Sequence, residues 1–208
     1  PLKELSKKFL SKNIIVSTDD KKIVSLVEKV GLKVPFLRPE ELSDDITGTV
    51  PVAAHALDWY ENKIKKIDYV LIVYPTALML NIKNITQAIE VLKSDNNCEL
   101  VMSASLFPSP IQRGMFLSND GFAKMYHPEL YQTRSQDLQT SYHDAGQFYL
   151  WKSESLRNNK TLVNSKAKLF IVDRNFVIDI DTIEDFKIAE ARLKFLKLNK
   201  FNKNWKFL

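Results

Sequence analysis

The chain has 208 residues, of which 45% are apolar and 26% charged, a balance typical of a single globular domain. No stretch approaches the ~18–20 apolar residues of a membrane span, the first residues lack the apolar core of a signal peptide, and the single cysteine excludes an internal disulfide. The net charge of +5 comes from the C-terminal end, because residues 187–208 carry seven basic residues and one acid. We therefore expect a cytoplasmic protein that binds neither membranes nor nucleic acid.

Short apolar runs alternate along the chain with segments of helical periodicity. In chain order, the apolar runs predict buried strands over 13–17, 32–36, 67–74, 100–106, 147–151, 169–172 and 176–181. The periodic segments predict helices after Thr18–Asp20, over 52–66, after Asn81 and after Thr182. Asn81 and the sequence Thr182–Asp185 are helix-start signals, the second with the pattern of a capping box.

Residues 107–142 differ from the rest, being rich in prolines, aromatics and polar residues with weak periodicity. We expect an excursion from the sheet with a hairpin at Asn119–Gly121. The irregular segment 38–51 is a second loop. Strands that alternate with helices predict one three-layer, mostly parallel α/β domain spanning 1–208.

In such a sheet, ligands bind at the carboxyl ends of the strands, where four polar clusters fall. They occupy residues 17–20, 74–76, 142–147 and 179–181. Asp179 and Asp181 are two apart on a predicted strand, so both carboxylates should project to one side. Two such carboxylates suit Mg²⁺ completed by water and phosphates, although Asp181 could instead cap the last helix.

Three arginines lie in irregular segments and are candidates for binding anions. Arg38 could help recognise a nucleobase or form an ion pair in a solvated loop. Arg113 and Arg134 could bind a carboxylate or form interface ion pairs. A structural role is expected for His55. His143 is next to Asp144, but no serine or cysteine nucleophile motif accompanies it, so a hydrolytic triad is not expected.

Five segments, in order, resemble the nonulosonic acid cytidylyltransferases, and within them the pseudaminic acid branch. They are Val34–Thr49, Pro108–Arg113, Thr133–Leu138, Tyr142–Tyr149 and Ile178–Phe186. The resemblance implies a Rossmann-like nucleotidyltransferase fold, Mg²⁺ dependence and a homodimer. It also implies the transfer of CMP from CTP to a nine-carbon 2-keto sugar acid, giving the CMP-sugar and pyrophosphate.

The resemblance further assigns roles to individual residues. By this likeness Asp179 and Asp181 hold the metal, while 107–142 forms the dimer contact and reaches a neighbouring sugar site. Nucleotide binding is assigned to Arg38, Asp45 and Thr49. Sugar binding is assigned to Tyr74, Thr76, Arg113, Arg134, Asp144, Gly146 and Gln147. The proton acceptor stays open between an aspartate and a metal-bound hydroxide.

One family feature has no counterpart in this sequence. The family begins with a strand and a glycine- and lysine/arginine-rich loop that cradles the triphosphate, whereas the five glycines here are widely spaced and no such loop precedes Ile14. We expect the chain as given to fold but to turn over CTP poorly. The alternatives are a non-catalytic nucleotide-sugar-binding homologue, a sialic or legionaminic acid enzyme of the same family, or a glycosyltransferase of related fold.

Overall fold

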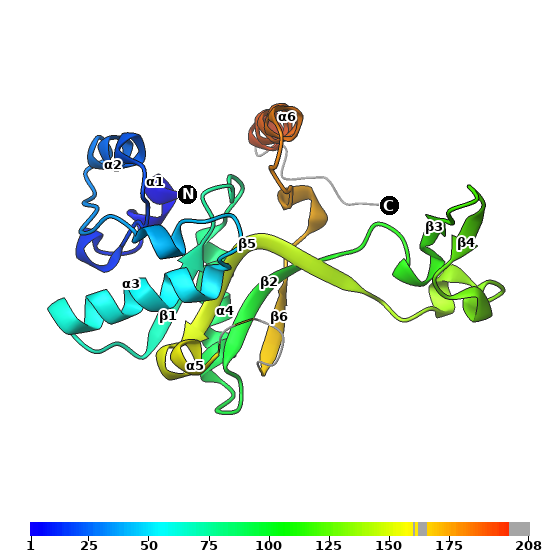
Figure 1. The fold of residues 1–208 in the computed structure, drawn as a ribbon, viewed down its shortest axis with the longest axis horizontal. Helices are drawn as coiled ribbons and strands as arrows, with labels where there is room; N and C mark the ends of the chain where they lie inside the picture. Colours follow the sequence, from blue (N-terminus) through cyan, green and yellow to red (C-terminus); the bar gives the residue numbers. More distant parts are fainter. Residues whose placement is uncertain (160, 162–165, 200–208) are drawn as a thin grey trace.

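The computed structural model describes residues 1–159, 161 and 166–199, which form a layered α/β body with an extended arm (Figure 1). The helices are α1 (Leu2–Leu5), α2 (Lys21–Glu28), α3 (Thr49–Lys63), α4 (Ile82–Lys93), α5 (Ser153–Asn158) and α6 (Ile183–Asn199). The strands are β1 (Tyr69–Val73), β2 (Leu100–Leu106), β3 (Met115–Leu117), β4 (Ala123–Met125), β5 (Tyr142–Lys152) and β6 (Ala167–Ile171). The last basic residues of the C-terminal segment, Lys200, Lys203 and Lys206, lie outside the described residues.

The central sheet has four strands in the order β1-β5-β2-β6. Strands β2 and β6 pair in parallel, whereas β5 lies antiparallel between β1 and β2. Strands β1, β2 and β6 therefore run in one direction and β5 opposes them. The α/β class is confirmed, and the carboxyl ends of the three like-directed strands meet at the edge where β5 begins.

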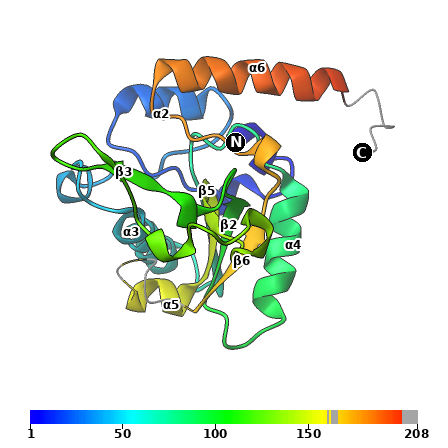
Figure 2. The same ribbon diagram turned by 90° about the vertical axis from the view of Figure 1, so that its right-hand side faces the viewer.

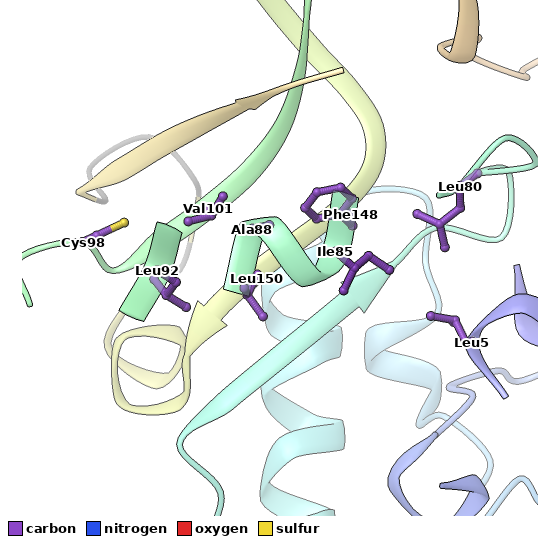
Figure 3. Packing of buried hydrophobic residues seen from close by; sticks show 10 residues of the cluster. Leu5, Leu80, Ile85, Ala88, Leu92, Cys98, Val101, Phe148 and Leu150 are labelled. Atoms are coloured by element: carbon purple, nitrogen blue, oxygen red, sulfur yellow. The ribbon is translucent and has the colours of Figure 1, made fainter. Parts of the chain in front are cut away.

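The two faces of the sheet bury separate hydrophobic clusters. On one face, Ile85, Ala88 and Leu92 of α4 pack on Val101, Phe148 and Leu150, together with Leu5 of α1 (Figure 3). On the other face, α3 and α5 cover a second cluster built around Leu57, Trp151 and Leu156. This confirms three layers, helix on sheet on helix. No helix in the described part of the chain has the length and apolar content needed to cross a membrane.

The local helix signals are confirmed. Asp20 accepts a hydrogen bond from the Lys22 N–H at the start of α2, and Asn81 does the same for Lys83 at the start of α4. Helix α3 begins at Thr49, earlier than the predicted 52, because a proline in the first turn, Pro51, needs no hydrogen-bond donor there.

Three predicted strands are wrong. Residues 13–17, 32–36 and 176–181 contain no strand, although their apolar runs are partly buried. Ile14, for example, packs against the α4-side cluster without joining the sheet. An apolar run indicates burial, and burial here is achieved by loops that pack on the sheet layers without pairing, backbone to backbone, with a strand.

The arm is the predicted excursion of residues 107–142. Strands β3 and β4 form its antiparallel hairpin, and Gly121 at the turn has a φ of +83°, a backbone region that favours glycine. The arm projects away from the body beyond β2 and β5 (Figure 1). Helix α6 lies across the opposite side of the molecule from α5 (Figure 2).

Candidate functional site

A large bulge interrupts β5 at the carboxyl end of β2. Met102 pairs with Tyr149 and Ala104 pairs with Asp144, so a two-residue step along β2 faces a five-residue step along β5. The buried Ser103 hydroxyl stabilises the bulge by accepting hydrogen bonds from the backbone N–H groups of residues 147 and 148, at 3.2 and 3.1 Å. Gly146 adopts a φ of +57° inside it. Bulges of this kind redirect side chains and occur often beside active sites.

The bulge fixes the carboxylate of Asp144. One of its oxygens, Oδ2, accepts a 2.5 Å hydrogen bond from the Tyr149 hydroxyl, and Oδ1 accepts one of 2.8 Å from the Gly146 N–H. Burial and this contact with Asp144 raise the pKa of Tyr149 well above its ordinary value, so the phenol stays protonated and donates. Asp144 itself is exposed, so a positioned carboxylate faces solvent at the edge of the sheet.

Tyr74 connects this carboxylate to the start of α3. Its ring lies 5.4 Å from the Tyr149 ring, centroid to centroid, and its hydroxyl shares a 2.5 Å hydrogen bond with Thr49 Oγ1. Its backbone N–H donates to the carbonyl of Gln147 at 3.1 Å. The structure therefore brings together Thr49, assigned to the nucleotide, and three residues assigned to the sugar: Tyr74, Asp144 and Gly146.

Arg38 forms the ion pair that the sequence left open as an alternative. Its Nη2 lies 2.7 Å from Asp19 Oδ1, and its Nε donates to Ser43 Oγ at 3.0 Å. The Arg38 side chain is 24% exposed. The guanidinium is thus held in place on the loop that leads to α3, and its role in nucleotide binding stays a prediction.

The loop before α3 is ordered by Asp44, a residue that the sequence did not single out. Its Oδ1 accepts hydrogen bonds from the N–H groups of Ile46 and Thr47, and these contacts lower its pKa. Asp45 next to it is exposed and free to meet a ligand. Thr76, assigned to the sugar pocket, is half-buried in the turn after β1.

Asp179 and Asp181 follow a single 3-10 turn, Arg174–Phe176, in irregular backbone. The expectation that strand alternation aligns them is therefore wrong. The alternative role for Asp181 as the cap of α6 is also wrong, because Thr182 and Asp185 form the capping box. Within the described residues, neither the Asp179 nor the Asp181 carboxylate has a hydrogen bond or an ion pair, and both side chains are exposed.

The donors at this segment fit Mg²⁺ that is partly coordinated by a substrate. Mg²⁺ usually takes one or two protein carboxylates and completes its shell with water and phosphate oxygens. Across the described ranges, no group of three or more His, Cys, Asp or Glu side chains could hold a metal ion. Asp179 and Asp181 could therefore bind Mg²⁺ together with a triphosphate but do not form a closed site by themselves.

Arg113 and Arg134 lie at 3-10 turns of the arm. The arm projects away from the body of the molecule (Figure 1). Arg113 Nη2 donates to the Thr133 carbonyl at 2.6 Å, which ties the two family motifs of the arm together. Arg134 pairs with Asp137 at 2.7 Å on the surface. The structure does not bring either arginine to the Asp144 cluster of the same chain.

Of the three histidines in the sequence, His143 and His55 have structural surroundings. His143 Nδ1 lies 2.7 Å from the backbone carbonyl of Asp144, not from its carboxylate, so no triad is formed. The His55 ring packs edge-on against Phe36 at 4.9 Å.

Sequence reasoning missed Tyr149, Ser103 and Arg192. Tyr149 and Ser103 fall in apolar strands, where alternation predicts burial and nothing more. Arg192 lies on α6, and its Nη1 donates to the Val177 carbonyl at 2.7 Å. A polar group inside an apolar run was the available signal for Tyr149 and Ser103.

Comparison with known proteins assigns the chain to a family. The profile of the cytidylyltransferase family matches residues 2–199. A pseudaminic acid cytidylyltransferase of Campylobacter jejuni subsp. jejuni serotype O:2 is 34% identical over 181 residues, 87% of this chain and 78% of that protein. A CMP-N,N'-diacetyllegionaminic acid synthase of Legionella pneumophila is 28% identical over 89% of this chain and 78% of its own length.

A solved structure supports the fold independently. CMP:2-keto-3-deoxy-manno-octonic acid synthetase complexed with CTP superimposes with a TM-score of 0.55. The match covers 88% of this chain and 80% of that chain at 12% sequence identity.

Proposed function

The chain belongs to the cytidylyltransferase family, and we propose that it transfers CMP from CTP to pseudaminic acid, releasing pyrophosphate. The observation that carries the proposal is the likeness to pseudaminic acid cytidylyltransferases across most of the chain. The legionaminic acid enzymes are less similar, so pseudaminic acid is the favoured acceptor.

In this reaction the anomeric hydroxyl of the sugar acid attacks the α-phosphorus of CTP. A new oxygen–phosphorus bond forms, the hydroxyl gives up its proton to a base, the bond to the β-phosphate breaks, and pyrophosphate leaves. Asp179 and Asp181 would hold Mg²⁺, which when bound offsets negative charge on the phosphate oxygens. Because such transfers depend mainly on positioning and charge neutralisation, exposed carboxylates that have no partner among the described residues suit this role.

The other residues divide between the two substrates. Arg38, Asp45 and Thr49 lie on or beside the loop before α3 and would bind the nucleotide. Asp144 presents a fixed carboxylate that can accept hydrogen bonds from sugar hydroxyls, beside Tyr74. The hydrogen bond shared by the Thr49 and Tyr74 hydroxyls joins one residue from each set, which supports adjacent binding of the nucleotide and the sugar, as an attack of sugar on nucleotide requires.

We propose a homodimer formed through the arm. The arm exposes large apolar side chains, including Leu117 at 76% and Phe122 at 68%, on a segment that projects from the body. Clusters of exposed apolar residues commonly mark protein interfaces. In a dimer, Arg113 and Arg134 could then reach the partner's sugar acid and pair with its carboxylate.

The proposed substrates indicate where the enzyme works and what its product is used for. CTP is a nucleotide of the cytoplasm, so we place the enzyme there. A relative from Campylobacter coli carries the name post-translational flagellin modification protein B, and we propose that the product supplies flagellin or surface polysaccharide glycosylation.

The deciding experiment is a pyrophosphate-release assay with CTP, Mg²⁺ and a panel of pseudaminic, legionaminic and N-acetylneuraminic acids. We expect turnover with pseudaminic acid to be the fastest, and Asp179→Asn to remove most of it. Faster turnover of another acid would reassign the substrate. CTP binding without turnover of any acid would favour a non-catalytic nucleotide-sugar-binding protein.

A further inference from the structure

The backbone that carries Asp179 and Asp181 has almost no hydrogen bonds of its own. The segment leaves β6, passes through the 3-10 turn Arg174–Phe176 and reaches α6 without joining the sheet. Within the described part of the chain, residues 178–180 make no hydrogen bond. Two exposed carboxylates on such a segment would vary in position unless neighbouring groups hold the backbone.

Two side chains from different elements hold the residues just before Asp179. Gln147, in the β5 bulge, donates from Nε2 to the Phe176 carbonyl at 2.5 Å. Arg192, on α6, donates from Nη1 to the Val177 carbonyl at 2.7 Å. The connection from β6 to α6, to which Phe176 and Val177 belong, lies between the sheet and α6 (Figure 1). Adjacent carbonyls are therefore bound by the sheet and by α6.

Each of these two hydrogen bonds comes from a single side-chain donor, and each is partly shielded from solvent. Gln147 is 3% exposed, so its amide is committed to the interior of the protein. Arg192 is half-buried, and its guanidinium is the group that connects α6 to the segment. The Arg192 Nη1 also lies 3.5 Å from the Arg174 carbonyl, so one nitrogen spans the end of the 3-10 turn.

We propose that Gln147 and Arg192 are positioning residues that set the place of Asp179 and Asp181 for a divalent cation and the CTP phosphates. The inference rests on the proposed function, since it concerns the same metal-binding segment. It gives Gln147 a role inside the protein in addition to its predicted place in the sugar pocket, and it makes α6 part of the site. Removing groups that orient metal ligands typically weakens metal binding by about 10–100-fold.

The test measures binding, not turnover. CTP affinity of the full chain is determined by calorimetry with and without Mn²⁺, and the gain in affinity that Mn²⁺ gives is compared among variants. Arg192→Met should reduce this gain about 10-fold, and Arg192→Lys, which keeps one donor and the charge, should reduce it less. Arg174→Met is the matched control, because it removes an equal charge from the same region without removing either contact.

Hydrogen exchange gives a second measurement on the same proteins. We expect faster exchange of the amides of residues 178–181 in Arg192→Met and Gln147→Met than in Arg174→Met. If Arg192→Met does not fold, Arg192→Lys and Gln147→Met carry the same comparison.

The outcomes separate the two proposals. If Arg192→Met keeps the full gain from Mn²⁺ while Asp179→Asn loses it, the positioning role is wrong and the metal role stands. If Asp179→Asn keeps the gain, or the unaltered chain shows none, the metal role is wrong and the positioning role falls with it.

Discussion

The neighbours Asp181 and Thr182 allow a sharp separation of chemistry from helix stability. The structure assigns the cap of α6 to Thr182, whose Oγ1 accepts the Asp185 N–H at 3.2 Å, while the Asp185 carboxylate accepts the Thr182 N–H at 2.9 Å. The Asp181 carboxylate makes no such contact within the described residues. Asp181→Asn should therefore lower turnover without lowering stability, and Thr182→Ala should do the reverse.

The magnitudes follow from these contacts. Losing a threonine cap costs about 1 kcal/mol, and for a chain of this size each kcal/mol shifts the melting temperature by roughly 2–4 °C. Asp181→Asn changes an exposed group, so its effect on the free energy of unfolding should stay within about 0.5 kcal/mol. Its effect on turnover should be on the order of 10²-fold, as expected for lost charge stabilisation in a transition state.

Thermal unfolding and pyrophosphate release, measured on the same protein preparations, give the stability and the turnover of each variant.

The pH dependence of the stability adds a check, because hydrogen bonds from Thr182 lower the pKa of Asp185 below its ordinary 3.8. A carboxylate whose pKa is lower in the folded than in the unfolded chain stabilises the fold at pH values above its unfolded pKa. This stabilisation is lost as the pH falls through the folded pKa. Thr182→Ala should therefore lose less stability than the unaltered chain between neutral pH and about pH 3.

A single pattern of results would refute this reasoning. If Asp181→Asn melts as low as Thr182→Ala and keeps full turnover, Asp181 is a structural residue and the metal assignment fails.

Three further predictions concern the site, the body and the arm. Tyr149→Phe removes the hydrogen bond to Asp144, which should cost about 1.5–3 kcal/mol, and a double-mutant cycle with Asp144→Ala should show coupling; additive effects would contradict the contact. Glu61→Gln should cost about 1–3 kcal/mol in urea unfolding, because the Glu61 side chain is 2% exposed and accepts hydrogen bonds from Lys66 and Arg157; an unchanged midpoint would show that this cluster contributes little. Leu117→Glu should shift the chain to monomers in sedimentation experiments, and a dimer of unchanged affinity would place the interface elsewhere.

Much of the fold was predictable because its signals are local. Asn81 and the sequence Thr182–Asp185 start helices through hydrogen bonds to residues two or three positions away, and these contacts exist in the structure. Strand β2 was predicted with its observed bounds, since its apolar run lies in the centre of the sheet and is buried on both faces.

The apolar run over 176–181 shows where such signals fail. Its isoleucines and valine are partly buried, as the pattern indicates. The segment nevertheless accepts hydrogen bonds from side chains of β5 and α6 and does not pair with the backbone of a strand. Whether a buried run joins a sheet depends on free strand edges, which a single sequence does not specify. The predicted alignment of Asp179 and Asp181 failed for this reason.

The contact between Asp144 and Tyr149 was beyond sequence reasoning for a geometric reason. In a regular strand, residues five apart point to opposite faces, so these two side chains could not meet. They meet because the bulge opposite Ser103 inserts extra residues into β5, so that the side chains of Asp144 and Tyr149 point to the same side. The sequence thus predicted that polar side chains gather at this edge of the sheet. The hydrogen bonds of Ser103 to the β5 backbone, which the sequence does not reveal, decide which of these side chains form hydrogen bonds with one another. The same bulge places Gln147 against Phe176, so one irregularity in β5 orders both the proposed sugar side and the proposed metal side of the site.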